Sequence, residues 1–135
     1  MSKIAVVYWS GTGNTEIMAN KIAEGVLGKG GQVDVFRVDK FDLGSVSEYD
    51  GFALGCPSMG AEVLEEDEFQ PFWDNIKGLL GDKKVVLFGS YGWGDGEWME
   101  TWKSEIDNVL STLILNETPD SDGEADCIAL ADYLV

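Results

Sequence analysis

The sequence predicts one α/β domain with a doubly wound, five-stranded parallel sheet and helices on both of its faces. Short apolar runs typical of strands alternate with stretches of helical spacing five times along the chain. The length of 135 residues suits a single domain with a core that is stable without disulfides. No repeat or linker interrupts the series, so we expect residues 1–135 to form one unit.

The first half of the chain contains three expected strands and one expected helix. Ile4–Trp9 is a nearly continuous apolar run, as expected of a strand that is buried on both faces. The next segment is predicted to be a helix with one packed face, formed by Met18, Ile22 and Val26. Glycines then end this helix, and the second and third strands are expected at residues 32–38 and at Gly51–Cys56.

The second half continues the alternation. Helical spacing from about residue 68 to 80 comes from Phe69, Phe72, Trp73, Ile76 and Leu80. A fourth strand is expected at Lys83–Gly89, and a further helical face is formed by Trp98, Trp102, Ile106 and Val109. Thr112–Leu115 is predicted to be a short fifth strand and Ala125–Leu134 a closing helix.

Charge and composition exclude several functions. The chain has 25 Asp and Glu against 9 Lys and Arg, a formal charge of −16 that repels nucleic acid and anionic membranes. It has no histidine and only two cysteines, Cys56 and Cys127, which argues against a zinc site and against histidine-based catalysis. Cys56 ends a buried strand and is interpreted as a core residue. No apolar run could form a signal-peptide core or cross a bilayer, so we expect a cytoplasmic protein. We also expect a monomer.

The turn after the first strand has the composition of a phosphate-binding loop. It lies directly before a helix, whose free N–H groups and positive dipole end favour an anion. Gly11 and Gly13 allow the backbone to approach a ligand closely, and uncharged donors are supplied by Ser10, Thr12, Asn14 and Thr15. A Walker loop would need a lysine here, and a dinucleotide fingerprint would need glycine in place of Glu16. A helix cap without a ligand remains the alternative.

The hexad Ser10-Gly-Thr-Gly-Asn-Thr15 resembles the phosphate-binding loop of flavodoxins. Three more loops are similar to those of the short-chain flavodoxins of anaerobic bacteria, in the same order: Gly55–Glu62, Gly89–Gly96 and Asn116–Asp120. The resemblance covers essentially the whole chain. It implies the strand order 2-1-3-4-5 and a non-covalently bound FMN. It also implies a low-potential one-electron carrier that shuttles between semiquinone and hydroquinone, substitutes for a ferredoxin and has no substrate of its own.

The resemblance assigns individual roles around the flavin. A large flat ring needs two flanking side chains, and the resemblance implies Trp93 on its outer face and Met59 on its inner face. Gly60 would turn its peptide toward flavin N5, which glycine permits, and Glu62 would accept the flavin N3–H. Further cofactor contacts are implied for Pro57, Ser58, Ala61, Ser90, Tyr91, Gly92, Gly94 and Asn116. Some relatives have a serine where Pro57 stands.

Acidic residues surround the expected flavin edge. No basic residue lies in the four loops, so a second negative charge on the flavin is unfavourable and a low potential is expected. Five acids in Glu62–Glu68 favour docking of basic-rimmed ferredoxin-type reductases and oxidoreductases. An acidic, solvated helix start remains the alternative explanation.

One segment departs from the family pattern. Between Trp102 and Asn116 the chain is about four residues shorter than the flavodoxins it resembles, so we expect a clipped helix or a short fifth strand. An NAD(P)H-dependent quinone reductase is the second functional hypothesis, although no segment is long enough to supply a separate nicotinamide site. A receiver-like signalling domain would need paired aspartates where Trp9 and Ser10 stand.

Overall fold

The structure is a computed structural model that describes residues 2–11, 13–59, 63–92, 94 and 96–135. Five parallel strands form one sheet in the order β2-β1-β3-β4-β5, which confirms the predicted fold class. The strands are β1 (Lys3–Tyr8), β2 (Gln32–Arg37), β3 (Gly51–Gly55), β4 (Lys84–Tyr91) and β5 (Val109–Asn116).

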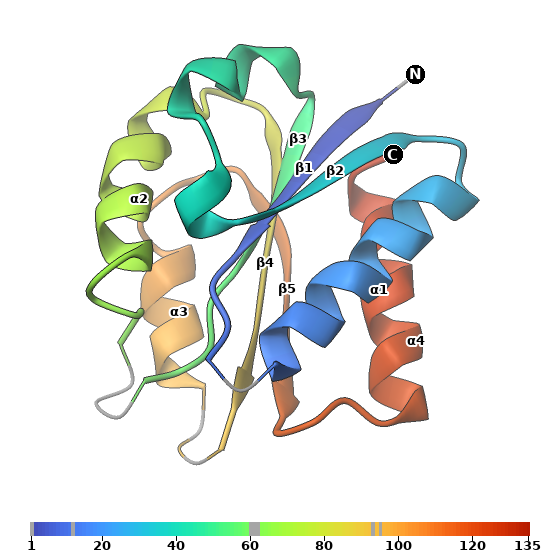
Figure 1. Ribbon diagram of the computed structural model, residues 1–135, viewed down its shortest axis with the longest axis vertical. Helices are drawn as coiled ribbons and strands as arrows, with labels where there is room; N and C mark the ends of the chain where they lie inside the picture. The colour runs from blue at the N-terminus through green and yellow to red at the C-terminus, as the bar shows by residue number, and fades with distance from the viewer. Residues whose placement is uncertain (1, 12, 60–62, 93, 95) are drawn as a thin grey trace.

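Helices cover both faces of this sheet. Figure 1 shows α1 (Asn14–Gly28) and α4 (Ser121–Leu130) side by side on one face, and α2 (Phe69–Ile76) and α3 (Glu97–Lys103) on the other. All the strands are parallel, so their carboxyl ends meet at one edge, the lower end of the molecule in Figure 1. The strand order reverses at β1 and β3, where ligands bind in sheets of this kind.

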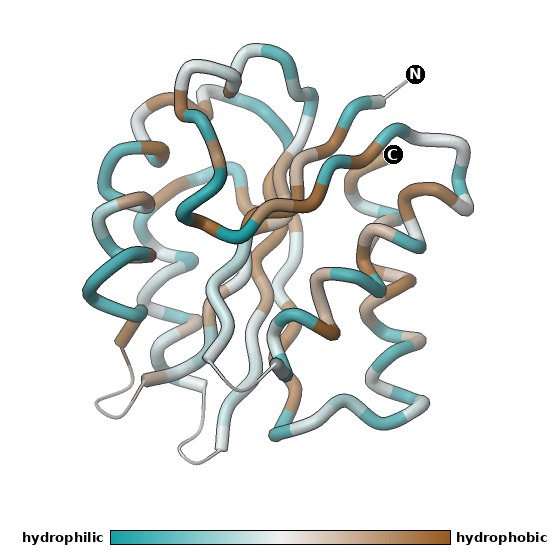
Figure 2. Tube along the Cα trace, viewed as in Figure 1, coloured by the Kyte–Doolittle hydropathy of each residue, from teal (hydrophilic) through white to brown (hydrophobic). Residues whose placement is uncertain are grey.

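The core is divided by the sheet into two apolar layers. The central strands β1 and β3 are almost completely buried because helices cover them on both sides. One layer packs against α1 and α4 around Met18 and Ile22, and the other packs against α2 and α3 around Trp73 and Trp102. Hydrophobic residues therefore gather along the central strands, as Figure 2 shows, while polar residues lie mostly on the outside.

The fifth strand differs from its prediction. β5 begins at Val109 and has 8 residues, so Thr112–Leu115 was too short a range and Val109 does not belong to a helix. Val85 pairs with Val109 and Val86 pairs with Ser111, which leaves Leu110 as an extra residue at a bulge. The bulge breaks the alternation by which a strand is recognised. Of the two expected consequences of the short segment between Trp102 and Asn116, the structure has the short helix: α3 has only 7 residues.

Two other helices also have different boundaries from those expected. The helical spacing of residues 68–80 divides into α2 and a 3₁₀ turn at Lys77–Leu79. The closing helix α4 begins at Ser121 rather than at Ala125, because the Asp120 carboxylate accepts the Gly123 N–H at 2.7 Å and caps the helix. It ends at Leu130, and a 3₁₀ turn follows at Ala131–Tyr133.

Candidate functional site

A pocket of about 370 Å³ opens at the carboxyl ends of the strands. It is lined by residues from the segments after β1, β3, β4 and β5, so the four predicted loops converge on one site. Its predicted members are Ser10, Gly11, Asn14, Thr15, Pro57, Ser58, Met59, Ser90, Tyr91 and Gly92. Trp9 and Glu117 also line it; Trp9 was not predicted, and Glu117 was expected only as a nearby negative charge rather than as a cofactor contact. Predictions for Thr12, Gly60, Ala61, Glu62 and Trp93 lie outside the described residues.

The first loop is organised by the hydroxyl of Ser10. Its Oγ accepts the N–H of Gly13 at 3.0 Å and the N–H of Glu16 at 3.4 Å, which fixes the loop against the first turn of α1. Gly13 has a φ of 99°, a left-handed conformation that favours glycine. Because the Ser10 oxygen already accepts two hydrogen bonds, its own hydrogen remains available to a ligand. The loop therefore presents an uncharged donor beside a helix N-terminus.

Two further contacts join this loop to neighbouring strand ends. Thr15 and Ser90 are buried, and their hydroxyl oxygens lie 3.1 Å apart. The side-chain oxygen of Asn14 accepts the hydroxyl of Thr118 at 3.0 Å, so the Asn14 amide group keeps its donors. The structure thus places Ser90 beside the first loop, while its contact with a phosphate stays a prediction, and it adds Thr118, which was not predicted.

The loop after β3 is held from both sides. The Ser58 N–H donates to the Ser90 carbonyl at 3.0 Å, and the Met59 N–H donates to the Val63 carbonyl at 3.1 Å. The second bond spans the segment in which Gly60, Ala61 and Glu62 were predicted to contact a flavin. The half-buried Met59 side chain therefore lies beside the pocket with its backbone fixed.

The loops after β4 and β5 meet at Tyr91. The Tyr91 ring packs at 5.9 Å from the ring of Trp98, and its carbonyl accepts the Glu117 N–H at 2.8 Å and the Asn116 side-chain amide at 3.3 Å. Asn116 therefore supports Tyr91, whereas Glu117, with a φ of 55°, lines the pocket. Gly94 and Gly13 were also predicted as contacts, and they lie in the loops but not among the lining residues.

Glu65 is a buried residue whose role the sequence did not reveal. Its carboxylate accepts the N–H groups of Asp67, Glu68 and Phe69 at 2.7–2.8 Å, which caps the start of α2. Burial alone would raise the pKa of this carboxyl, but the three amide donors outweigh it and the pKa is lowered. The Glu65 N–H also donates to the Cys56 sulfur at 3.4 Å. Glu65 thus ties the β3 loop to α2.

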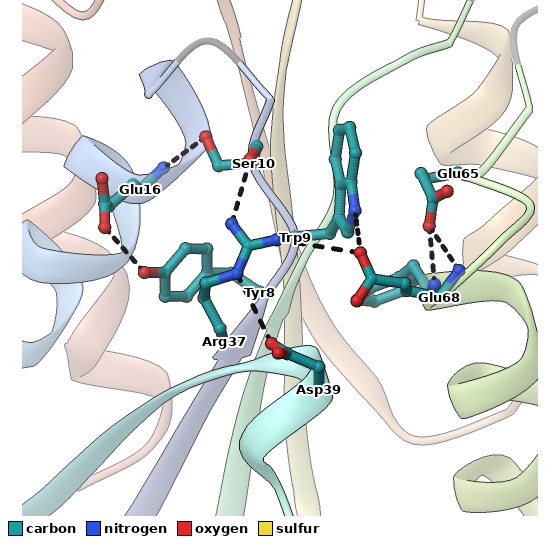
Figure 3. A network of polar contacts seen from close by, with 9 residues as sticks. Tyr8, Trp9, Ser10, Glu16, Arg37, Asp39, Glu65 and Glu68 are labelled. Carbon is teal, nitrogen blue, oxygen red and sulfur yellow. Dashed lines mark hydrogen bonds and ion pairs between the residues drawn. The ribbon is translucent and has the colours of Figure 1, made fainter.

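A network of polar contacts centred on Arg37 adjoins the first loop (Figure 3). One Arg37 nitrogen donates to the Ser10 carbonyl at 3.2 Å, and the guanidinium pairs with Asp39 at 3.5 Å and with Glu68 at 3.8 Å. Glu68 also accepts the indole N–H of Trp9 at 3.1 Å. Arg37 ends β2, outside the four loops in which the sequence showed no basic residue, so only the strand order 2-1 brings it here.

The remaining candidate groups are structural. Burial raises the pKa of the Cys56 thiol to about 12 and that of Cys127 to about 12, which fits the interpretation of Cys56 as a core residue. Among the described residues, no three His, Cys, Asp or Glu side chains are grouped so as to bind a metal ion. No described helix combines the length and apolarity needed to cross a bilayer.

The donor set of the pocket fits a phosphorylated aromatic molecule. The uncharged donors of Ser10, Asn14 and the Thr15–Ser90 pair gather at the N-terminus of α1, where a phosphate is stabilised. Met59, Tyr91 and Gly92 add less polar lining from the loops after β3 and β4. These two regions match the phosphate and the ring of a flavin mononucleotide.

Comparisons with known proteins agree with this geometry. A family model described as Flavodoxin matches residues 6–125. A flavodoxin from Megasphaera elsdenii is 46% identical over 122 residues, covering 87% of this chain and 89% of that protein. One from Clostridium beijerinckii is 45% identical over 128 residues, covering 91% and 92%. The solution structure of two-electron reduced Megasphaera elsdenii flavodoxin superposes with a TM-score of 0.87 at 43% identity, covering 96% of this chain and 98% of that one.

Proposed function

This chain belongs to the flavodoxin family of FMN-binding electron carriers, which generally substitute for ferredoxin, and we propose that its pocket holds the FMN phosphate at the start of α1. The observation that carries this proposal is the Ser10 hydroxyl, which accepts two loop amides and keeps a hydrogen to donate. The Thr15–Ser90 pair and the Asn14 amide add donors. The hydrogen bonds to a dianion are charge-assisted and therefore strong.

The flavin ring would lie between the loops after β3 and β4. Met59 lines the pocket from the first of these loops, and Tyr91 and Gly92 line it from the second. By resemblance, Trp93 would cover the outer face of the ring, Glu62 would accept its N3–H and Gly60 would turn its carbonyl toward N5; these three residues lie outside the described part of the chain. The remaining contacts proposed are those of Gly11, Thr12, Gly13, Pro57, Ser58, Ala61, Gly94 and Asn116.

The surroundings of the pocket favour a low reduction potential. Glu117 lines the pocket, and the chain carries a formal charge of −16. Formation of the fully reduced, anionic cofactor would add negative charge to this environment, which is unfavourable. The protein would then act as a carrier in one-electron steps, without a substrate of its own. Its expected state as a cytoplasmic monomer stays a prediction.

The partners proposed are redox proteins with a basic rim around their own cofactor. The exposed acids Glu66, Asp67 and Glu68 follow the loop that lines the pocket, so a positively charged rim would be steered toward the flavin edge. Glu65 belongs to the same run but is buried and caps α2, so it contributes less to such a surface than the sequence suggested.

Titration of the apoprotein with FMN and with riboflavin tests the phosphate site. FMN should bind at least about 100-fold more tightly, because each hydrogen bond to a charged group contributes about 1.5–3 kcal/mol. Equal affinities for the two flavins would overturn the proposed phosphate site. Steady-state oxidation of NADPH by the FMN-loaded protein alone would favour the quinone reductase hypothesis over a carrier.

A further inference from the structure

Arg37 lies at the carboxyl end of β2, next to the first loop, although it was not expected to take part in the site. Tyr8 is its partner in the β1–β2 register, and the loop begins two residues after Tyr8. Its side chain is 41% exposed, so its two ion pairs with Asp39 and Glu68 contribute little to stability on their own. What distinguishes Arg37 is its hydrogen bond to the backbone of the loop.

This hydrogen bond acts on the peptide that joins Ser10 to Gly11. The guanidinium donates to the Ser10 carbonyl at 3.2 Å, and in a trans peptide the N–H of Gly11 points in the opposite direction, away from Arg37. A charged donor on the carbonyl also polarises the peptide, which makes its N–H a stronger donor. Gly11 lines the pocket, so this peptide is part of the phosphate site proposed above.

The guanidinium is itself held in one orientation. Because the group is planar, contacts to its Nε and to one terminal nitrogen fix the direction of the other terminal nitrogen. Asp39 contacts Nε and Glu68 contacts the second terminal nitrogen, which leaves the first directed at the Ser10 carbonyl (Figure 3). Glu68 also accepts the indole N–H of Trp9, the residue before Ser10, so the Trp9–Ser10 segment is held by both its side chain and its backbone.

The charges of this network would not attract a phosphate directly. Arg37 is paired with two carboxylates, so the cluster of these three groups carries a net negative charge. We propose that Arg37 is a positioning residue that orients the Ser10–Gly11 peptide toward the FMN phosphate and thereby sets the preference for FMN over riboflavin. This inference rests on the proposed phosphate site.

The test compares Arg37→Met with Lys40→Met. Methionine preserves an unbranched aliphatic chain, and both substitutions remove one positive charge. Lys40 serves as the control because it is exposed and lies beyond β2, in the 3₁₀ turn Val38–Lys40. Dissociation constants for FMN and for riboflavin are measured at constant ionic strength. Arg37→Met should weaken FMN binding roughly 10-fold, as expected for a lost charge-assisted hydrogen bond, and should change riboflavin binding by less than about 2-fold. Lys40→Met should leave both constants within about 2-fold of wild type.

Other outcomes separate the two proposals. Arg37→Lys should recover part of the FMN preference, because an ammonium can still donate to the Ser10 carbonyl; a lysine variant no better than methionine would overturn the inference. Equal losses for FMN and riboflavin in Arg37→Met, or an equal loss in Lys40→Met, would also overturn it while leaving the phosphate site intact. A wild-type protein that does not discriminate between the two flavins would overturn the phosphate site itself.

Discussion

Glu65 shows how one side chain can hold a loop in place. Its carboxylate accepts three backbone amides at the start of α2, while its own N–H contacts the sulfur of Cys56 at the end of β3. The loop between these points contains Met59 and the residues proposed to contact the flavin. Removal of the carboxylate would leave three amides without their acceptor and would loosen the end of that loop that leads into α2, whereas the backbone contact with Cys56 would remain.

We therefore expect Glu65→Ala to reduce the free energy of unfolding by about 1–3 kcal/mol, in the range observed for lost helix caps and buried hydrogen bonds. Urea denaturation at pH 7 measures the change. Glu66→Ala is the matched control, because Glu66 is exposed and the same charge is lost. It should shift stability by no more than about 0.5 kcal/mol. Equal effects of the two substitutions would contradict the capping role.

The stability difference between wild type and Glu65→Ala is expected to depend on pH. The pKa of Glu65 is lowered in the folded protein from an ordinary value of 4.5, so the ionised form is the one that folding stabilises. Its contribution is fully present above pH 4.5 and is lost as the pH falls through the lowered folded-state pKa. The stability difference between wild type and Glu65→Ala should shrink over that acidic range. A difference that grows on acidification would contradict the assignment.

At the scale of elements, α1 and α4 pack closely through a glycine. A Cβ added to Gly25 would overlap the backbone carbonyl oxygen of Ile128 and would lie 3.0 Å from Ala131 Cβ, so an alanine there would push the two helices apart. Gly28 lies one turn farther along α1, and a Cβ at this position would meet no atom within 4 Å. The two glycines therefore lie in the same helix but differ in how closely their surroundings are packed.

Gly25→Ala should lower the free energy of unfolding by about 1–3 kcal/mol, the usual cost of overpacking a close contact. Gly28→Ala should be neutral or stabilising by up to about 1 kcal/mol, since alanine is the better helix former. Thermal or urea denaturation of both variants measures the contrast. A Gly25→Ala protein as stable as wild type would show that α1 and α4 are not in the close contact described.

Strands β1 to β4 and the convergence of four loops could be predicted, because long apolar runs and the rules for parallel sheets determine them. The start of β5 could not, because the bulge at Leu110 depends on pairing with β4. Arg37 and Glu65 were missed for a related reason. The proposed role of Arg37 depends on its contact with the loop that follows the neighbouring strand β1, and this contact exists only in the folded sheet. Glu65 lies in a run of acidic residues, and no local sequence feature distinguishes this buried helix cap from its exposed neighbours.

At the scale of the whole molecule, the acidic residues behind the formal charge of −16 differ in how freely they can attract a partner. Several acids have partners: Glu24, Asp74, Glu105 and Asp132 form ion pairs with lysines. Glu66 and Asp67 are exposed and follow the loop whose residues Pro57, Ser58 and Met59 line the pocket. Long-range attraction of a basic partner would come from the total charge, and its direction from such local groups.

The rate of electron transfer to a basic-rimmed reductase should therefore fall as ionic strength rises. Screening shortens the Debye length from about 30 Å at 0.01 M salt to about 10 Å at 0.1 M, so steering weakens strongly over this range. Stopped-flow measurements of the second-order rate constant check this. A double Glu66→Gln, Asp67→Asn variant should be slower at low salt and should show a shallower salt dependence. A rate that does not respond to salt would contradict electrostatic docking.

The position of Trp9 in the pocket wall also gives the protein an intrinsic optical probe. Trp9 lines the proposed flavin site and Trp98 packs against the pocket-lining Tyr91, whereas Trp73 and Trp102 are buried in the layer between the sheet and α2 and α3. An isoalloxazine ring absorbs light at the wavelengths at which indole emits, so occupancy of the pocket would quench the ultraviolet-excited emission of Trp9. The same emission band, through the buried indoles, would shift to longer wavelengths on denaturation, and one fluorimeter could follow cofactor loading and unfolding in an unlabelled sample.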